Sequence, residues 1–226
     1  MYISYEIRLL GEHDIRDVEK CMEHLKKEKF DREIFVTPTL KYIETIISGY
    51  GKTFGVYSDN ILAGFTSIVF PKKGKNNIGH HIQLSDYDLL RVAQIENLYI
   101  RPEYRKKGLG KNLLKYSISH IENNNTILLS TISPNNTSSL SIAFELEQKI
   151  INLIHIYGVT RYLMFKDYLE NHNSIKTNGI IEVNRTNYLK TGELLHAGYE
   201  GVTFNKTKDK ILFHKDVHIW EDMKQA

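Results

Sequence analysis

The chain has 226 residues, of which 41% are hydrophobic and 25% are charged, and its formal net charge is +3. This length allows one sizeable core with an appendage, and the mild basicity does not favour a dedicated nucleic-acid binder. Cys21 is the only cysteine, which excludes an intrachain disulfide and a cysteine-ligated zinc ion. No basic leader precedes an apolar run, and no apolar stretch approaches the ~18 residues of a membrane span, so we expect a soluble cytoplasmic protein.

The first elements are a strand and two helices. The segment "YEIRLL" from Tyr5 alternates as a strand does, and Asp14 marks the start of a helix. The apolar stripe of this helix is formed by Ile15, Val18, Met22 and Leu25. Cys21 lies beside the stripe without a basic neighbour that would lower its pKa, so we expect a buried, inert thiol. Thr37 and Pro38 predict the start of a second helix.

The middle of the chain predicts a hairpin, a loop and a strand. The hairpin consists of "KTFGVYS", a polar turn at Asp59 and Asn60, and "ILAGFTSIVF". Residues 71–84 are basic, contain glycine and lack periodicity, which predicts a mobile loop. Ser85 is placed to begin a short helix, and "VAQIENLYI" (92–100) predicts a strand.

A basic, glycine-containing connection, "RPEYRKKGLG", follows that strand and leads into a helix. The helix has apolar or small residues at helical spacing, namely Gly110, Leu113, Leu114, Ser117, Ile118 and Ile121, and is predicted to end at Asn123–Asn125. A strand "TILLSTI", a helix from about Ser138 and two strands, "IINLIHIY" and "RYLMFKDY", come next. The order β-α-α-β-β-β-α-β-α-β-β, to about Leu169, predicts an α/β (α+β) chain with a mixed sheet.

Glycines between a strand and a helix suit a phosphate, because a backbone without Cβ atoms can approach the ligand closely. The dinucleotide fingerprint G-x-G-x-x-G does not fit, because Leu113 stands at its last position. The Walker motif does not fit either, because Arg105 and Asn112 stand where glycine and Ser or Thr are needed. The motif that does fit is [R/Q]-x-x-G-x-[G/A], formed by Arg105, Lys106, Lys107, Gly108, Leu109 and Gly110.

With this motif, the segment "IENLYIRPEYRKKGLGKNLL" resembles the signature of the GNAT superfamily, the acyl-CoA-dependent N-acyltransferases. The predicted element order resembles that family over 1–170. The resemblance implies that the amides of Lys106 to Gly110 bind the pyrophosphate of coenzyme A, with Arg105 at the start of this loop. It also implies that the backbone of the preceding strand holds the pantetheine arm through Leu98, Tyr99 and Ile100. Aligned amides at a helix N-terminus suit an anion, and the basic side chains add attraction.

The resemblance also suggests residues for catalysis. Glu96 lies where many relatives place a carboxylate that acts as a base through water, although a solvent-facing strand glutamate is an equal alternative. The oxyanion is expected on a strand amide near Leu98. The family's usual acid, a tyrosine, is replaced here by Ala143, so Tyr157 is the nearest candidate for an acid, with a structural role as the alternative. Asn136 and Ser139 match positions on the cofactor side.

The tail after residue 170 predicts a strand at "GIIEV", a helix within "NRTNYLKTGELLHAG" and a hairpin of "VTFNK" and "KILFHKDV". The spacing from Asn187 to Gly198 also matches the family pattern. Either the helix and hairpin are a C-terminal αββ appendage, or they complete the fold and residues 134–170 are an insertion. We favour a GNAT domain over 1–170 and an extension over 171–226 packing on it, because short connections follow residue 134.

The sequence therefore predicts an acetyl-CoA-dependent N-acetyltransferase that acts by direct attack in a ternary complex. We expect a small-molecule primary amine as substrate, no nucleic acid and no membrane, and leave a homodimer open. The ten histidines form no ligand spacing such as H-E-x-x-H, so no metal is expected. An acyl-CoA-binding sensor on a decayed scaffold and a nucleic-acid-binding module remain alternatives.

Overall fold

The structure is a computed structural model that describes residues 4–28, 31, 33–121, 124–169 and 179–215. The chain forms two compact units, residues 1–131 and residues 132–226, which are described in turn. The predicted domain boundary at residue 170 lies outside the described residues and stays a prediction. In the described part of the chain, no helix is long and apolar enough to cross a membrane.

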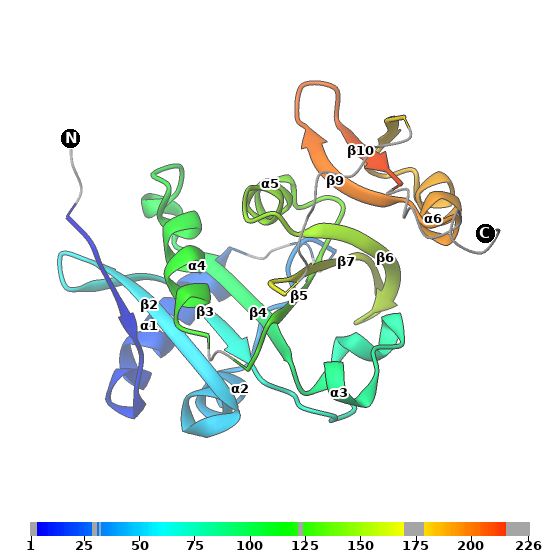
Figure 1. Cartoon of the computed structure of the whole chain (residues 1–226). Coiled ribbons are helices and arrows are strands. Elements are labelled where there is room, and N and C mark those ends of the chain that lie inside the picture. Colours follow the sequence, from blue (N-terminus) through cyan, green and yellow to red (C-terminus); the bar gives the residue numbers. More distant parts are fainter. Residues whose placement is uncertain (1–3, 29–30, 32, 122–123, 170–178, 216–226) are drawn as a thin grey trace. The chain divides into compact units, whose positions relative to one another are not determined.

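The first unit is built on a mixed sheet with the strand order β1-β2-β3-β4-β5 (Figure 1). Its strands are β1 (Glu6–Leu9), β2 (Gly51–Ser58), β3 (Ile61–Val69), β4 (Val92–Ile100) and β5 (Ile127–Ile132). Neighbours from β1 to β4 are antiparallel, whereas β5 runs parallel to β4. A parallel neighbour requires a crossover, which the helix between β4 and β5 supplies. The predicted α/β fold with a mixed sheet is confirmed.

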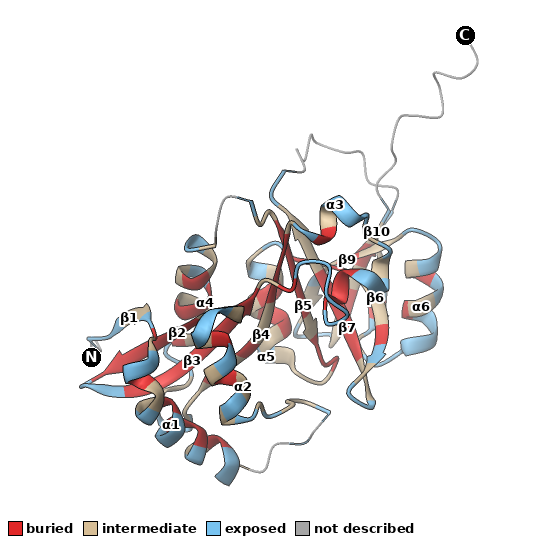
Figure 2. Ribbon diagram, turned by 90° about the horizontal axis from the view of Figure 1, so that it is seen from below, coloured by how far each residue is buried: buried red, intermediate tan, exposed pale blue. Residues whose placement is uncertain are grey.

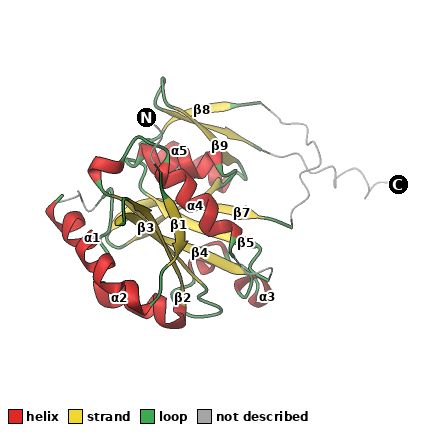
Figure 3. Ribbon diagram, turned by 90° about the vertical axis from the view of Figure 1, so that its left-hand side faces the viewer, coloured by secondary structure: helices red, strands yellow, loops and turns green. Residues whose placement is uncertain are grey.

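Helices pack on both faces of this sheet (Figure 3). The first unit contains α1 (Ile15–Lys27), α2 (Leu40–Thr45) with a π-helical continuation (Ile46–Tyr50), α3 (Asp86–Leu89) and α4 (Leu109–Ser119). The apolar stripe of α1 packs with Ile43 of α2 against Phe65 and Tyr99 of the sheet, while Leu109 and Leu113 of α4 pack against Phe54 on the other face. Buried residues are therefore concentrated in the central strands (Figure 2).

The predicted inert thiol agrees with this packing. Cys21 is 1% exposed in the core cluster beneath α1. Burial raises the pKa of the Cys21 thiol to about 12, so it stays protonated at neutral pH.

Asp14 stands at the start of α1 but does not cap it with its side chain. Its carboxylate accepts two hydrogen bonds from the Arg8 guanidinium, at 2.6 and 2.9 Å, and one from the Gly11 amide at 2.9 Å. The guanidinium lowers the pKa of Asp14 to about 2, although burial opposes this shift. The prediction of a helix start at Asp14 is therefore confirmed, and the side chain ties β1 to the helix.

The segment predicted as a mobile, aperiodic loop instead contains a 3-10 helix (Ile78–Ile82). Asn77, which is 1% exposed, caps this helix by accepting from the Gly79 amide at 2.9 Å. Its side-chain amide donates to the carbonyls of Lys72 and Leu89, the latter at 3.0 Å. A buried asparagine with these partners holds the segment against α3, a role that the absence of periodicity does not reveal.

The second unit has a sheet in the order β7-β6-β9-β10-β8. Its strands are β6 (Lys149–Ile156), β7 (Val159–Asp167), β8 (Ile181–Asn184), β9 (Glu200–Asn205) and β10 (Lys210–His214), and its helices are α5 (Thr137–Glu145) and α6 (Tyr188–His196). Residues of both helices share one core cluster with strand residues, among them Ala143, Tyr162, Leu194 and Phe213. The tail thus forms a β-α-β-β segment, because β8 pairs with β10.

The second unit contains the same local structure twice. Asn136 and Asn187 cap α5 and α6 by accepting from the amides of Ser139 and Lys190 at 3.0 and 3.1 Å. Both helices end on a residue in the left-handed conformation, Glu147 with φ 61° and Gly198 with φ 82°. In each case the next amide donates back to the helix, to Ala143 from Gln148 at 3.0 Å and to Leu194 from Tyr199 at 2.9 Å.

The hairpins repeat as well. The pairing of β6 with β7 skips Ile151, and the pairing of β9 with β10 skips Val202, so both hairpins carry a bulge at the equivalent residue. Equivalent residues of the two hairpins meet where β6 and β9 pair antiparallel, at Ile150 and Gly201. The segments α5-β6-β7 and α6-β9-β10 are therefore related by a local two-fold axis, which explains why both matched the same family spacing.

We predict that Asp14→Asn destabilises the protein by about 2 kcal/mol at pH 7, because the folded state loses a carboxylate whose pKa is depressed by about two units. The carboxylate of Asp14 contributes this stability at pH values above the ordinary aspartate pKa near 4, and the contribution is lost as the pH falls toward 2. Urea unfolding should therefore show a difference between wild type and variant that shrinks from pH 7 to pH 2. Glu12→Gln, at an exposed position, is the control and should change little. A difference that is the same at both pH values would contradict the prediction.

Candidate functional site

Strand β4 is irregular at Glu96. In its pairing with β3, Asn97 lies opposite Ser67 and Ile95 lies opposite Ile68, so Glu96 is the extra residue of a bulge. A bulge turns a side chain out of the regular alternation of the strand and is frequent beside functional sites. The sequence shows a regular strand here, because the extra residue is defined only by the register of the partner.

The Glu96 carboxylate is held by neighbouring polar groups. The side-chain nitrogen of Gln94 donates a hydrogen bond to the Glu96 carboxylate. The side-chain oxygen of Gln94 accepts a hydrogen bond from the Ile78 amide at 3.1 Å. Burial raises the pKa of Glu96, and hydrogen bonds from Gln94 and Tyr42 oppose this rise. Glu96 is therefore not a fully solvated strand glutamate. A partly buried carboxylate with a raised pKa is a better proton acceptor than a fully solvated one once it is ionised.

The edge of β4 loses its parallel neighbour after the bulge. The register of β4 with β5 runs from Val92, opposite Ile127, to Ile95, opposite Ser130. Beyond the bulge, residues 97–100 are in register with β3 but not with β5. Tyr99 is buried, whereas Leu98 and Ile100 are half-buried and pack near α4. The second half of β4 can therefore pair with an extended ligand, as a further strand would.

Asn97 adds a polar group to this part of β4. It is 5% exposed, and its side-chain nitrogen donates to no residue in the described part of the chain. A buried donor without a partner costs free energy unless a ligand or water satisfies it. This observation agrees with a polar ligand along β4.

The loop between β4 and α4 presents backbone amides. Lys106 and Gly108 both have positive φ, 59° and 76°, and Leu109 begins α4. Within the described ranges, the amides of Lys106 to Gly110 donate to no other group. A Cβ built on Gly108 would meet no atom within 4 Å, so the space over this residue is open. Open amides at the N-terminus of an eleven-residue helix form a site for an anion.

The side chain of Arg105 braces this loop. Its Nε donates to the Ile100 carbonyl at 2.7 Å, and its Nη2 lies 2.7 Å from the Glu28 carboxylate at the end of α1. Tyr99 donates to the same carboxylate at 2.7 Å, and the guanidinium lies over the Tyr99 ring. Arg105 thus ties the end of β4, the loop and α1 together, a role that its position in the motif did not reveal.

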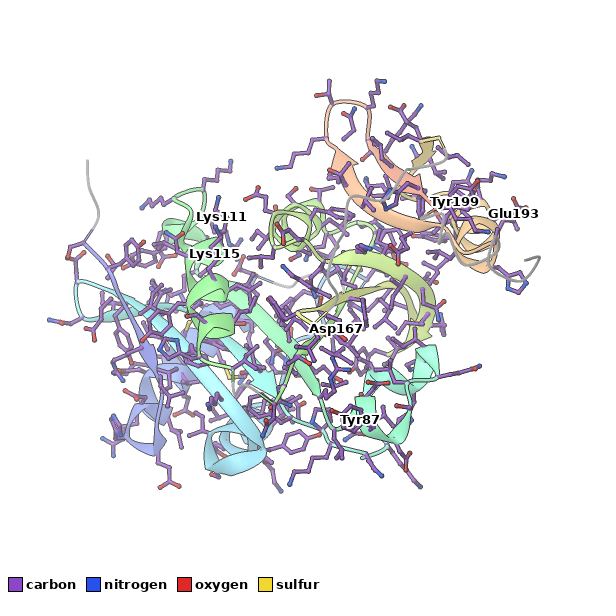
Figure 4. All side chains as sticks on the ribbon, viewed as in Figure 1. Tyr87, Lys111, Lys115, Asp167, Glu193 and Tyr199 are labelled. Carbon is purple, nitrogen blue, oxygen red and sulfur yellow. The ribbon has the colours of Figure 1, made fainter. Side chains whose placement is uncertain are left out.

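Further basic residues surround the loop and α4. Lys106 and Lys107 are exposed, and Lys107 donates to the Glu103 carbonyl at 2.9 Å. Lys111 and Lys115 extend from α4 (Figure 4). These cations raise the local concentration of a negatively charged ligand near the open amides.

The other predicted site residues belong to the second unit. Asn136 caps α5, because its side-chain oxygen accepts a hydrogen bond from the backbone amide of Ser139. Tyr157 and Gly158 form the two-residue turn between β6 and β7, both with positive φ, and Tyr157 is 46% exposed. A tyrosine in the left-handed conformation is strained, as is frequent at functional positions.

The arrangement in the first unit can bind an anionic, extended ligand and accept a proton. The loop amides suit phosphate oxygens, the part of β4 beyond its register with β5 suits an amide-containing chain, and Glu96 is the candidate base. In the described part of the chain, no group of three His, Cys, Asp or Glu side chains could hold a metal ion.

Comparison with protein families matches residues 18–145 to the model of the "Acetyltransferase (GNAT) family". The match covers more than half of the chain and includes β4, the loop, α4 and α5, whereas it ends before α6. A search of curated proteins finds no match.

Solved structures with a similar fold are also found. They include yncA from Salmonella typhimurium with its cofactor acetyl-CoA, at 14% identity and a TM-score of 0.57, covering 76% of this chain and 98% of that one. The paia N-acetyltransferase from Thermoplasma acidophilum in complex with coenzyme A has 18% identity and a TM-score of 0.52, covering 74% and 100%. The ribosomal-protein-S18-alanine N-acetyltransferase from Escherichia coli has 14% identity and a TM-score of 0.54, covering 76% and 99%. At these identities the likeness concerns the fold.

We predict that Arg105→Lys lowers the free energy of unfolding by about 1–2 kcal/mol, because lysine keeps the charge but cannot bridge the Ile100 carbonyl and Glu28 together. Urea unfolding measures this change. Arg16→Lys, on the exposed side of α1, is the matched control and should remain within ~0.5 kcal/mol of wild type. An Arg105→Lys variant as stable as the control would contradict the bracing role.

Proposed function

The chain belongs to the acetyltransferase (GNAT) family, and on this basis we propose that it transfers an acetyl group from acetyl-CoA to a primary amine by direct attack in a ternary complex. The observation that carries the proposal is the loop of open amides at the start of α4, placed directly after a strand that loses its parallel neighbour. Acetyl-CoA, when bound, supplies the activated acyl group as a thioester.

The proposed cofactor contacts come from the backbone. The amides of Lys106 to Gly110 bind the pyrophosphate, helped by the positive end of α4 and by the nearby lysines. The backbone of Leu98 to Ile100 holds the pantetheine arm along the part of β4 that has no pairing with β5. Arg105 contributes by holding the loop. Asn136 and Ser139 remain proposed contacts from the second unit.

Glu96 is the proposed base. Deprotonation of an amine with a pKa near 10.4 costs about 4–5 kcal/mol at pH 7, so a positioned proton acceptor lowers the barrier. Gln94 and Tyr42 hold the carboxylate, and the bulge sets its direction. These features support a base that takes the proton of the amine directly or through one water molecule.

Two further groups complete the proposed reaction. We propose that the amide of Leu98 stabilises the oxyanion of the tetrahedral intermediate, because Leu98 lies beyond the register of β4 with β5. Tyr157 is proposed to protonate the departing thiolate. Its positive φ and its exposure at the turn support this role.

The acceptor is proposed to be a small amine. Similar solved structures include an aminoglycoside acetyltransferase with coenzyme A and kanamycin and the ribosomal-protein-S18-alanine N-acetyltransferase, so small molecules and proteins both occur as substrates among proteins of this fold. We propose a cytoplasmic enzyme in which no nucleic acid or membrane takes part, and a homodimer is one arrangement to test by light scattering.

We predict that acetyl-CoA raises the melting temperature of the wild-type protein and that Gly108→Leu abolishes this shift. A ligand that binds only the folded state stabilises it by mass action. The leucine side chain would occupy the open space over the loop amides, while no protein atom lies within 4 Å of its Cβ. Thermal unfolding with increasing acetyl-CoA measures the effect.

The matched control is Gly198→Leu, at a glycine with similar φ at the end of α6. Both substitutions impose a strain of about 1–2 kcal/mol, so both variants should melt below wild type in the absence of ligand. The control should keep its response to acetyl-CoA. An equal response in the two variants would remove the proposed pyrophosphate site.

We predict that Glu96→Gln lowers kcat/KM by ~10²- to 10⁴-fold at neutral pH, with a smaller loss at high pH, where the amine loses its proton unaided. In the wild-type enzyme, activity should fall as the pH drops through the raised pKa of Glu96, because the protonated carboxyl cannot act as a base. This acidic limb should be missing in the variant. Glu19→Gln, on the exposed side of α1, is the control. An equal loss at every pH would make Glu96 a structural residue.

A further inference from the structure

Strand β1 forms the outer edge of the sheet in the first unit (Figure 2). It pairs with β2 on one side, and no strand of the described chain pairs with its other side. Free edges invite pairing with another chain, and proteins often protect them with lysine, proline or a bulge. The register of β1 with β2 is regular, and residues 4–9 contain neither lysine nor proline. This edge is therefore open to a further strand.

The backbone groups of alternate residues point to the free edge. The amide of Leu10 donates to the Thr53 carbonyl at 2.8 Å, so these two residues form a hydrogen-bonded pair between the strands. Such pairs alternate along an antiparallel ladder. The amides and carbonyls of Tyr5, Ile7 and Leu9 therefore point away from β2.

One face of β1 is apolar. Ile7 packs against the core cluster beneath α4, and the Tyr5 hydroxyl accepts a hydrogen bond from Asn112 of α4 at 2.7 Å. Leu9 lies on the same face, because side chains alternate along a strand. Tyr5 and Leu9 are 41% and 52% exposed, so both leave apolar surface in water beside the free edge.

The other face of β1 carries one acid and one base. Arg8 binds the Asp14 carboxylate on this face, yet its side chain remains 34% exposed. Its guanidinium also donates to the Leu9 carbonyl at 3.4 Å, an oxygen that can accept a second hydrogen bond. Glu6, two residues before Arg8, is exposed. Opposite charges thus stand on either side of Ile7.

We propose that β1 is the interface of a homodimer, in which β1 of a second copy pairs antiparallel around a two-fold axis at Ile7. A two-fold axis perpendicular to the sheet sets each face of β1 beside the same face of its partner. Tyr5 then lies opposite the partner's Leu9, and Glu6 lies opposite the partner's Arg8. The outward backbone groups of Ile7 pair with those of the partner's Ile7. Apolar surface meets apolar surface, and acid meets base, so the edge is complementary to itself.

The charges favour this register over its neighbours. An axis at Glu6 would place two glutamates opposite each other, and an axis at Arg8 would place two arginines opposite each other. Like charges directly opposite destabilise a strand pair. An axis at Tyr5 or Leu9 would place no acid of β1 opposite a base of β1. Only the axis at Ile7 pairs both charges of the strand.

The short strand limits the strength of the dimer. Stable interfaces bury about 1,600 Å² in total, and a pairing of residues 5–9 buries less than this. We therefore expect a dissociation constant in the micromolar range or weaker. The proposal does not depend on the acetyl-transfer reaction, because the edge of β1 lies outside the proposed catalytic and cofactor residues.

The first test is disulfide trapping in the full chain. The native Cys21 is 1% exposed and should not react. Tyr5→Cys and Leu9→Cys proteins are oxidised separately and as an equal mixture, with a size tag on one of them. In the proposed register the two positions form a hydrogen-bonded pair with Cα atoms about 5.5 Å apart, within the range of a disulfide. The mixture should therefore form a tagged–untagged covalent dimer. Each variant alone should remain monomeric, because its two copies of the cysteine lie roughly 14 Å apart.

Two results of this test would overturn the proposal. Covalent dimers that form as readily from either variant alone as from the mixture would reject the axis at Ile7. A mixture that forms no covalent dimer at a protein concentration of about 1 mM would reject β1 as an interface.

The second test measures the dissociation constant by sedimentation equilibrium. Glu6→Lys places a cation opposite the partner's Arg8 at both symmetric contacts, so it should weaken the dimer about 10-fold or more at low ionic strength. Glu19→Lys, on the exposed side of α1, makes the same change in net charge and should dimerise as wild type does. The difference between the two variants should narrow in high salt, which screens exposed charges. Thermal unfolding checks that both variants are folded.

Equal dissociation constants for the folded Glu6→Lys and Glu19→Lys proteins would contradict the pairing of charges across the axis. A wild-type protein that stays monomeric up to about 1 mM would overturn the dimer itself.

Discussion

The hydrogen-bonding requirement of one strand, β4, organises the first unit. Each backbone amide and carbonyl needs a partner, and β4 has two neighbouring strands over its first half but only β3 over its second half. The bulge at Glu96 falls where the pairing with β5 ends. The first half of β4 is therefore fixed in the core by two neighbouring strands. The bulge sets the direction of the Glu96 carboxylate, and the second half of the strand lies beyond the register with β5. The loop of free amides follows directly, so these features lie in sequence order along one segment.

Polar side chains hold this segment in place. Gln94 joins the Ile78 amide to Glu96, and Arg105 joins the end of β4 to Glu28. Interactions of this kind restrict the position of functional groups more than they add stability, because their net free energies are small after desolvation. The basic residue of the phosphate motif thus serves two parts of the molecule, since its amide belongs to the loop and its side chain reaches α1.

The second unit shows how one local plan is used twice. Asparagine caps, left-handed helix ends and matching bulges recur in the segments α5-β6-β7 and α6-β9-β10, although few of the equivalent residues are the same. Backbone geometry explains the recurrence, because an asparagine cap and a left-handed residue satisfy the ends of a helix whatever its other side chains are. The antiparallel contact of β6 with β9 makes the two copies share one apolar core.

The sequence by itself determined the elements and the fold class, because periodicity, caps and turn residues act over a few neighbouring positions. It also identified the amide loop, since the motif from Arg105 to Gly110 is continuous. Only the tertiary structure decided the bulge at Glu96 and the bracing role of Arg105. Each of these depends on strand register or on a partner distant in the chain, and no local pattern encodes such contacts. For the same reason, the sequence found two candidate ends for the fold without revealing that they are copies of one another.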